Sequence, residues 1–114
     1  MTEVDLKRMH ALLVGELATL TETLEASLES AKGTALDQAR IGRLSRMDAL
    51  QSQAMAQGAN RRLVEDIAAI RAALERIQRG TYGICAGCDR EINLMRLEVY
   101  PATERCLPCA KRRE

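Results

Sequence analysis

Cys85-Ala-Gly-Cys88 and Cys106-Leu-Pro-Cys109 are the two stretches that decide the fold of this 114-residue chain. Seventeen residues lie between Cys88 and Cys106. Two C-x-x-C pairs at such a separation are typical of a tetrahedral site in which four thiolates bind one zinc ion. Each pair is expected to form a tight knuckle, with Gly87 at positive φ in the first and Pro108 stiffening the second. Because four thiolates leave no open position for a water molecule, the single Zn²⁺ ion is predicted to be structural.

Other uses of the cysteines have less support. Disulfides need an oxidising compartment, whereas the N-terminal MTEVDLKRMH lacks the apolar run of a signal peptide, so a cytoplasmic location is expected. A redox C-x-x-C needs only one pair and usually begins a helix that follows a strand. A thiol redox sensor that releases zinc on oxidation stays open as an alternative, because it would use the same four cysteines.

The composition argues against several functional classes. The chain has seventeen Lys or Arg residues and sixteen Asp or Glu residues, so its charge is nearly balanced. Simple polyanion binding would need an excess of positive charge. No apolar stretch approaches the roughly twenty residues of a membrane span. The lone histidine, His10, is expected on a helix surface or seam. No enzyme is predicted, because the sequence shows neither a Ser/His/Asp constellation nor paired carboxylates.

Two long helices are predicted upstream of the cysteines, over residues 2–31 and 44–79. Thr2 is expected to cap the first helix, Gly33 to lie in the break after it, and Gly80 to end the second. Apolar side chains recur at alternating spacings of four and three, which is typical of helices that pair along a narrow seam. The first seam is Leu6, His10, Leu13, Leu17, Leu20, Leu24, Ser27 and Ala31. The clearest part of the second seam is Leu63, Ile67, Ile70, Leu74 and Ile77.

The predicted fold is mainly α: an antiparallel coiled-coil helical hairpin followed by a small four-cysteine zinc finger and a short C-terminal helix. The expected domains are the hairpin at 1–79, with its tip near 32–45, and the zinc finger at 80–114. A monomer is favoured because Gly33 and Gly42 suit a turn. Pairing between chains stays open, since the seams alone do not choose.

The cysteine region carries a specific resemblance. The segment Gly80-Thr-Tyr-Gly-Ile-Cys-Ala-Gly-Cys-Asp-Arg-Glu-Ile92, then Arg96-Leu97-Glu98, Pro101 and the second cysteine pair, resemble the four-cysteine zinc finger of the DksA/TraR family. The upstream hairpin matches the layout of that family, in particular of its shorter members. The resemblance implies a transcription regulator that binds RNA polymerase without sequence-specific DNA contact. It further implies a hairpin that enters the secondary channel of the polymerase, often with the nucleotide alarmone ppGpp.

The predicted tip departs from the Asp-x-x-Asp-x-Ala pattern of the best-known members, whose positions fall here on Gly42, Ser45 and Met47. The candidate partner-binding residues are Asp37, Arg40, Arg43, Ser45, Arg46, Asp48 and Ala49. The chief alternative function is a zinc-ribbon nucleic-acid-binding protein. Its candidate contacts are Arg90, Arg96, Arg105 and the terminal Lys111, Arg112 and Arg113.

Overall fold

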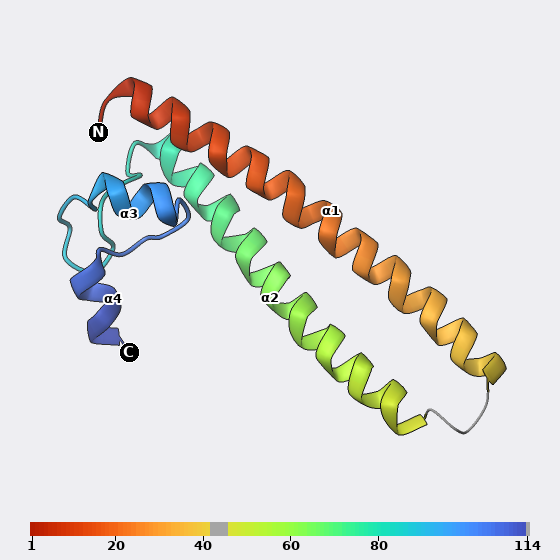
Figure 1. Cartoon of the computed structure of the whole chain (residues 1–114). Coiled ribbons are helices and arrows are strands. Elements are labelled where there is room, and N and C mark those ends of the chain that lie inside the picture. The colour runs from red at the N-terminus through yellow and green to blue at the C-terminus, as the bar shows by residue number, and fades with distance from the viewer. Residues whose placement is uncertain (42–45, 114) are drawn as a thin grey trace. The chain divides into compact units, whose positions relative to one another are not determined.

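A computed structural model of the chain describes the backbone of residues 1–41 and 46–113, and the side chains of residues 1–30 and 57–112. The described part contains four α-helices (Figure 1). They are α1 (Glu3–Ile41), α2 (Arg46–Arg79), α3 (Leu94–Val99) and α4 (Leu107–Arg113). No described helix combines the length and the apolar character that a membrane crossing would require. The predicted mainly α fold is confirmed.

The chain divides into two compact units. Unit 1 consists of Met1–Ala18 and Ala68–Glu114, and unit 2 consists of Thr19–Ile67. The start of α1, the end of α2 and the cysteine region therefore belong to one unit. The predicted domain boundary between residues 79 and 80 stays a prediction.

The predicted helix break at residues 31–34 is wrong. α1 continues through Gly33 to Ile41. The described part of α2 begins at Arg46, and its predicted start at residue 44 lies outside the described residues. A glycine inside a helix costs only about 1 kcal/mol relative to alanine. The neighbours Ala31, Lys32 and Ala35 are good helix formers, so the helix tolerates this cost. Of the tip region expected at 32–45, residues 32–41 are helical and 42–45 lie outside the described residues.

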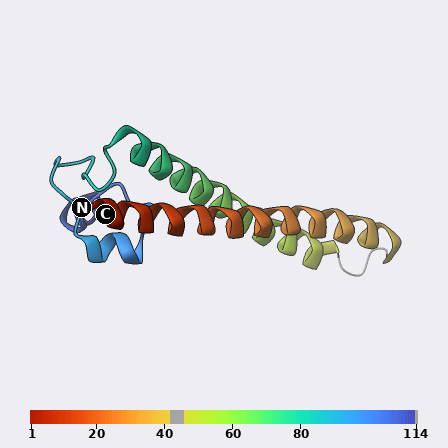
Figure 2. The same ribbon diagram turned by 90° about the horizontal axis from the view of Figure 1, so that it is seen from above.

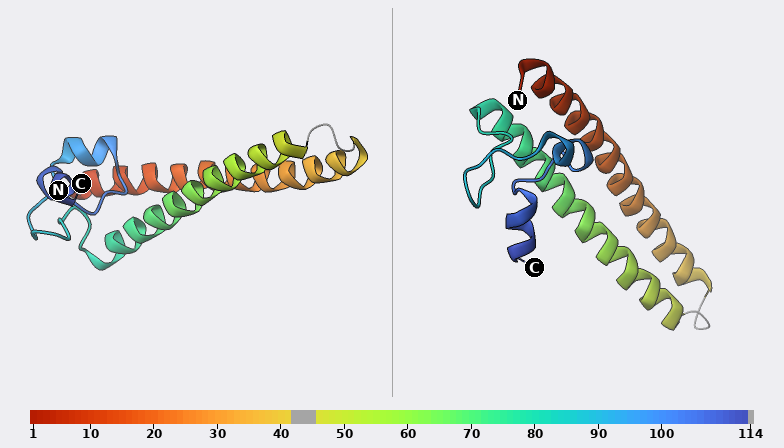
Figure 3. Two further views of the ribbon diagram at one scale, coloured as in Figure 1. Left: turned by 90° about the horizontal axis from the view of Figure 1, so that it is seen from below. Right: turned by 60° about the vertical axis from the view of Figure 1, so that its left-hand side comes forward.

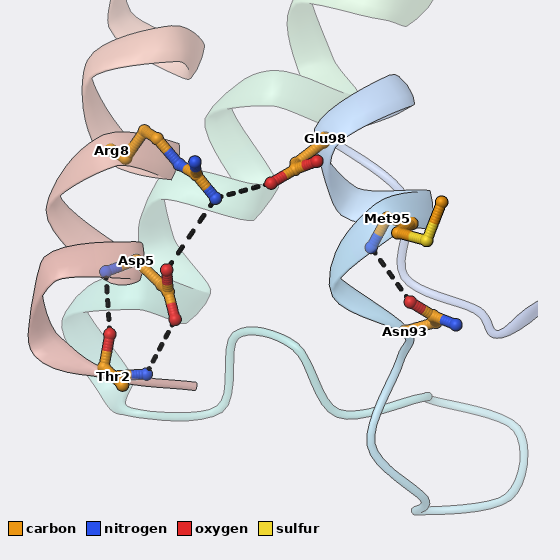
Figure 4. A network of polar contacts seen from close by, with 6 residues as sticks. All are labelled: Thr2, Asp5, Arg8, Asn93, Met95 and Glu98. Carbon is orange, nitrogen blue, oxygen red and sulfur yellow. Dashed lines mark hydrogen bonds and ion pairs between the residues drawn. The ribbon is translucent and has the colours of Figure 1, made fainter.

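Both long helices carry the terminal signals that the sequence predicts. At the start of α1, the Thr2 hydroxyl accepts a hydrogen bond from Asp5 N at 3.1 Å, and Asp5 Oδ2 accepts one from Thr2 N at 3.2 Å (Figure 4). These reciprocal bonds form a capping box. Hydrogen bonding from the Thr2 hydroxyl, and then from its backbone N–H, holds the pKa of the Asp5 carboxyl below its ordinary value. At the end of α2, Gly80 has φ +76° and its N–H donates to Ile77 O. The N–H of Thr81 donates to Arg76 O, which completes a Schellman motif.

The core of unit 1 joins both long helices to the cysteine region. Met9 and Leu13 of α1, Ile70 of α2, Leu97 of α3 and Cys85 are its largest fully buried side chains. His10 is exposed, so of its two predicted places the helix surface is confirmed and the seam is wrong. Met9 occupies the seam position instead. Leu6, Met9 and Leu13 are spaced by three and then four residues, whereas Leu6, His10 and Leu13 are spaced by four and then three. Both spacings fit one helical face, so the sequence pattern did not distinguish Met9 from His10.

α3 was not predicted from the sequence. It is only six residues long, and the side chain of Asn93 caps it by accepting a hydrogen bond from Met95 N at 2.9 Å (Figure 4). The combination of Asn93 before the helix and Pro101 after it was the available signal. α3 lies beside the start of α1, where Arg8 Nη2 donates to Glu98 Oε1 at 2.6 Å (Figure 2).

Unit 2 pairs part of α1 with part of α2 within one chain (Figure 3). Leu20, Leu24 and Leu63 are half-buried along this pair. The Ser27 hydroxyl donates to Asn60 Oδ1 at 2.7 Å, so one layer of the seam is polar. A polar layer of this kind fixes the register of two helices at some cost in stability. The predicted intramolecular hairpin is confirmed, whereas the monomeric state stays a prediction.

The neighbouring residues Leu12 and Leu13 provide a matched test of this packing. Leu13 is 0% exposed and Leu12 is 46% exposed. We expect Leu13→Ala to lower the free energy of unfolding by about 2–5 kcal/mol, because it leaves a cavity in the core of unit 1. Leu12→Ala is expected to change it by no more than about 0.5 kcal/mol. Urea unfolding of the zinc-loaded protein measures both values. Equal losses of unfolding free energy in the two variants would contradict the burial of Leu13.

Candidate metal centre

The first knuckle is a turn closed by backbone hydrogen bonds. The N–H of Cys85 donates to Arg90 O at 2.8 Å, and the N–H of Asp89 donates to Cys85 O at 2.9 Å. An isolated antiparallel bridge between Ile84 and Glu91 lies just outside this turn. Cys85 and Cys88 are therefore held at the two sides of one tight loop.

The role predicted for Gly87 in this knuckle is wrong. Gly87 does not adopt positive φ, and the residue with left-handed backbone is Asp89 at φ 60°. Aspartate is among the few residues other than glycine that adopt this conformation readily. Gly87 leaves space for two neighbouring side chains instead. A Cβ atom there would lie 2.9 Å from Arg105 Nη1 and 3.2 Å from Cys109 Sγ.

The second knuckle is the start of α4. Cys106 precedes the helix, Pro108 lies in its first turn, and the N–H of Ala110 donates to Cys106 O at 2.9 Å. Proline is well suited to a first turn, where a backbone N–H has no partner inside the helix. The helical turn brings Cys109 to the same side as Cys106.

The two knuckles bring all four sulfurs together. The four Sγ atoms lie within 4.8 Å of one another, and those of Cys88 and Cys106 are 3.7 Å apart. A tetrahedral ion with Zn–S bonds of about 2.3 Å places its sulfurs about 3.8 Å apart. Cys85 and Cys109 are buried, Cys106 is half-buried and Cys88 is exposed. The cluster thus fits one closed tetrahedral zinc site.

Backbone donors prepare one of these sulfurs as a thiolate. Cys85 Sγ accepts hydrogen bonds from Cys106 N and from Gly87 N, each at 3.3 Å. These bonds, that from Cys106 above all, lower the pKa of Cys85 to about 6. In contrast, hydrogen bonds with the sulfurs of Cys106, Cys85 and Cys88 raise the pKa of Cys109 to about 12. Four crowded thiolates need a cation among them, and Zn²⁺ supplies that charge.

Two arginines fix the loop that leads to the second knuckle. Arg96 of α3 donates from Nε to Arg105 O at 2.9 Å and from Nη2 to the hydroxyl of buried Thr103 at 3.3 Å. Arg76 of α2 donates from Nη2 to the carbonyl oxygens of Ala102 and Thr103, both at 3.4 Å. These contacts hold the backbone immediately before Cys106 against the helices of unit 1.

Further contacts hold the two ends of the same loop. The N–H of Ala86 donates to Glu104 O at 2.8 Å, which joins the loop to the first knuckle. Tyr82 donates its hydroxyl to Pro101 O at 2.7 Å, and burial raises the pKa of this phenol. Arg76 and Thr103 could not be identified from the sequence, because nothing local marks a residue whose partners lie on another element.

The residues predicted at the tip fall within unit 2, whereas the four cysteines belong to unit 1. Asp37 and Arg40 belong to the backbone of α1. Arg46, Asp48 and Ala49 belong to the backbone of α2. Arg43 and Ser45 lie outside the described residues. A role for these residues in partner binding stays a prediction.

Zinc removal tests the four-cysteine site directly. We expect a strong chelator to unfold residues 81–109 while part of the helical pair stays helical, because a structural zinc site contributes about 10 kcal/mol or more of apparent binding energy. Cys88→Ser is expected to abolish stoichiometric zinc binding, since a hydroxyl is a poor substitute for a thiolate. Metal analysis and circular dichroism measure both effects. Glu91→Gln changes an exposed neighbour and should keep one zinc per chain.

Arg96 offers a second test, with Arg90 as its matched control. Arg96→Lys loses the planar fork that reaches both Arg105 O and Thr103, so we expect a loss of about 1–3 kcal/mol in the free energy of unfolding. Arg90 is exposed, and its side chain has no partner within the described part of the chain. Arg90→Lys should therefore be neutral. Equal behaviour of the two variants in thermal and chemical unfolding would contradict the role of Arg96.

Comparison with known proteins agrees with this arrangement. Residues 80–114 match the family described as prokaryotic dksA/traR C4-type zinc finger. An uncharacterized protein of Aquifex aeolicus (strain VF5) is 51% identical over 39 residues, which cover 34% of this chain and 27% of that protein. The chain thus matches about a quarter of the length of this relative.

A solved structure extends the likeness to the whole chain. The transcription factor DksA2 from Pseudomonas aeruginosa superposes with a TM-score of 0.89 at 21% sequence identity, over 99% of this chain and 85% of that one. Together with the four clustered sulfurs, these comparisons identify one structural zinc ion. The chain has the fold of DksA2, and its residues 80–114 form a C4-type zinc finger of the dksA/traR type.

Proposed function

We propose that this chain is a transcription factor of the DksA/TraR type that binds RNA polymerase in the cytoplasm. The observation that carries the proposal is the agreement with DksA2, itself a transcription factor, over 99% of the chain. The match of residues 80–114 to the dksA/traR zinc finger supports it independently. The proposed action needs no sequence-specific DNA contact, and ppGpp is its proposed co-effector.

The helical pair is the proposed element that enters the secondary channel. Among its described residues, unit 2 contains only parts of α1 and α2. At 1.5 Å per residue, its part of α1 is about 35 Å long. A two-helix element of this kind has the narrow cross-section that a channel would admit. The charged residues from Asp37 to Asp48 are the proposed contacts near its end.

The zinc finger offers a surface for anchoring the partner. A groove of about 960 Å³ lies between α3 and α4, and we call it the α3–α4 groove. Its lining includes Met95 and Val99, which are 72% and 87% exposed, together with the exposed Leu107. Exposed apolar side chains that gather in one groove are typical of a protein-binding site. Arg90 and Arg112 line the same groove and favour an acidic partner surface.

The nucleic-acid alternative is weaker. Arg96 donates its side-chain hydrogen bonds to the chain itself, and Arg105 packs against Gly87. The near balance of charge and the scarcity of aromatic residues also disfavour phosphate tracking and base stacking. A redox sensor is compatible with the proposal, because oxidation of the zinc thiolates would add regulation. Catalysis is not proposed, since four thiolate ligands leave zinc no open position.

A pull-down with core RNA polymerase tests the proposal, using Val99→Asp and Val4→Asp as a matched pair. Val4 is 75% exposed on α1 and does not line the α3–α4 groove. We expect wild type and Val4→Asp to bind alike. Val99→Asp should bind at least about tenfold more weakly, because a carboxylate would be buried at an apolar contact and face an acidic partner.

Photocrosslinking within the complex with polymerase tests the proposed position of the helical pair. A photoreactive residue placed at Ser45 should crosslink to polymerase segments that line the secondary channel. A wild-type protein that does not bind polymerase would refute the proposed function. Binding without channel crosslinks would keep polymerase as the partner and reject the proposed insertion.

A further inference from the structure

Arg105 lies against the glycine face of the first knuckle. A Cβ atom on Gly87 would be 2.9 Å from Arg105 Nη1 and 3.2 Å from Cys109 Sγ. Arg105 Nη1 and Cys109 Sγ both lie close to this Cβ position, so the two atoms are no more than about 6 Å apart. Gly87 therefore allows a guanidinium group to approach a predicted zinc ligand across a position that any other side chain would fill.

The positive charge of this side chain is not used elsewhere in the described structure. Arg105 Nε is buried and has no hydrogen-bond partner among the described residues. None of the ion pairs found in that part of the chain includes Arg105. Its hydrogen bonds with Arg96 and Thr103 use backbone atoms of Arg105. The side chain is thus free to act on the sulfur cluster.

The chemistry of the cluster explains what a cation would do there. One Zn²⁺ ion with four thiolates has a net charge of −2, whereas the zinc-free cluster, in which protons replace the metal on sulfur, carries less negative charge. A cation within about 4–6 Å stabilises the negatively charged state over the neutral one. Charged groups outside a metal's ligand shell commonly change metal affinity in this way.

We propose that Arg105 compensates part of the charge of the zinc-thiolate site and thereby strengthens zinc retention. The inference concerns a residue outside the four predicted ligands and rests on their binding zinc. It gives Gly87 a defined role, which is to let the guanidinium reach the cluster. Arg105 is a supporting residue of the metal site in this account and not a nucleic-acid contact.

Zinc competition with a chromogenic chelator tests the proposal on the full chain. Arg105→Gln removes the charge, Arg105→Lys keeps it, and Arg71→Gln makes the same change at an exposed residue of α2 in unit 1. We expect Arg105→Gln to raise the dissociation constant for zinc by about 10- to 100-fold. Arg105→Lys should retain most of the affinity, and Arg71→Gln should behave as wild type.

Cobalt substitution provides the accompanying structural readout, because the absorption of tetrahedral cobalt-thiolate shows whether each variant forms the site. Failure of Arg105→Gln to form the site while Arg105→Lys forms it would also support the need for charge. Equal affinities of Arg105→Gln and Arg71→Gln would overturn the proposal. Equal weakening by Gln and Lys would overturn it as well, since packing rather than charge would then be responsible. A wild-type protein that binds no zinc would instead refute the metal site itself.

Discussion

The mutual repulsion of four closely spaced thiolates, and its relief by one divalent cation, is the constraint on which the zinc finger depends. The sulfurs come from two knuckles and lie within 4.8 Å of one another. The segment between the knuckles has no sheet among its described residues, and α3 has only six residues. Such a segment buries little apolar surface, so metal binding supplies folding free energy that its small core does not. The turn at Asp89, the loop before Cys106 and the start of α4 all serve to bring the sulfurs into place.

The zinc finger is built into unit 1 through contacts with both long helices. Leu97 of α3 is fully buried in the same core as Met9 and Ile70. Arg76 extends from α2 to the loop before Cys106, and Gly80 ends α2 with the turn that begins the cysteine region. The ion pair between Arg8 and Glu98 is exposed and adds little stability, although it marks the side of α3 that faces α1. Loss of zinc is therefore expected to loosen contacts well beyond the knuckles, including the surface proposed to bind polymerase.

Local chemistry decided which features could be predicted from the sequence. The C-x-x-C spacing predicted each knuckle, and Gly80 predicted the end of α2, because both signals lie within a few residues of their effect. The break expected at Gly33 failed because one unfavourable residue does not outweigh continued helix formation on both sides. The sequence pattern did not distinguish Met9 from His10, because spacings of three and four are equivalent on one helical face. The role of Gly87 was not predictable, since it depends on Arg105 and Cys109, which only the folded chain brings near.

The most direct test of this account is X-ray absorption at the zinc K-edge of the purified, reduced protein. A closed site of four cysteines predicts a first shell of four sulfur atoms at about 2.3 Å, with no nitrogen or oxygen ligand. The shell should be the same with and without a bound partner, because the proposed role of the zinc is structural. A shell containing an oxygen or nitrogen atom would contradict the account, since it would mean that a cysteine is not a ligand and that the site has an open position.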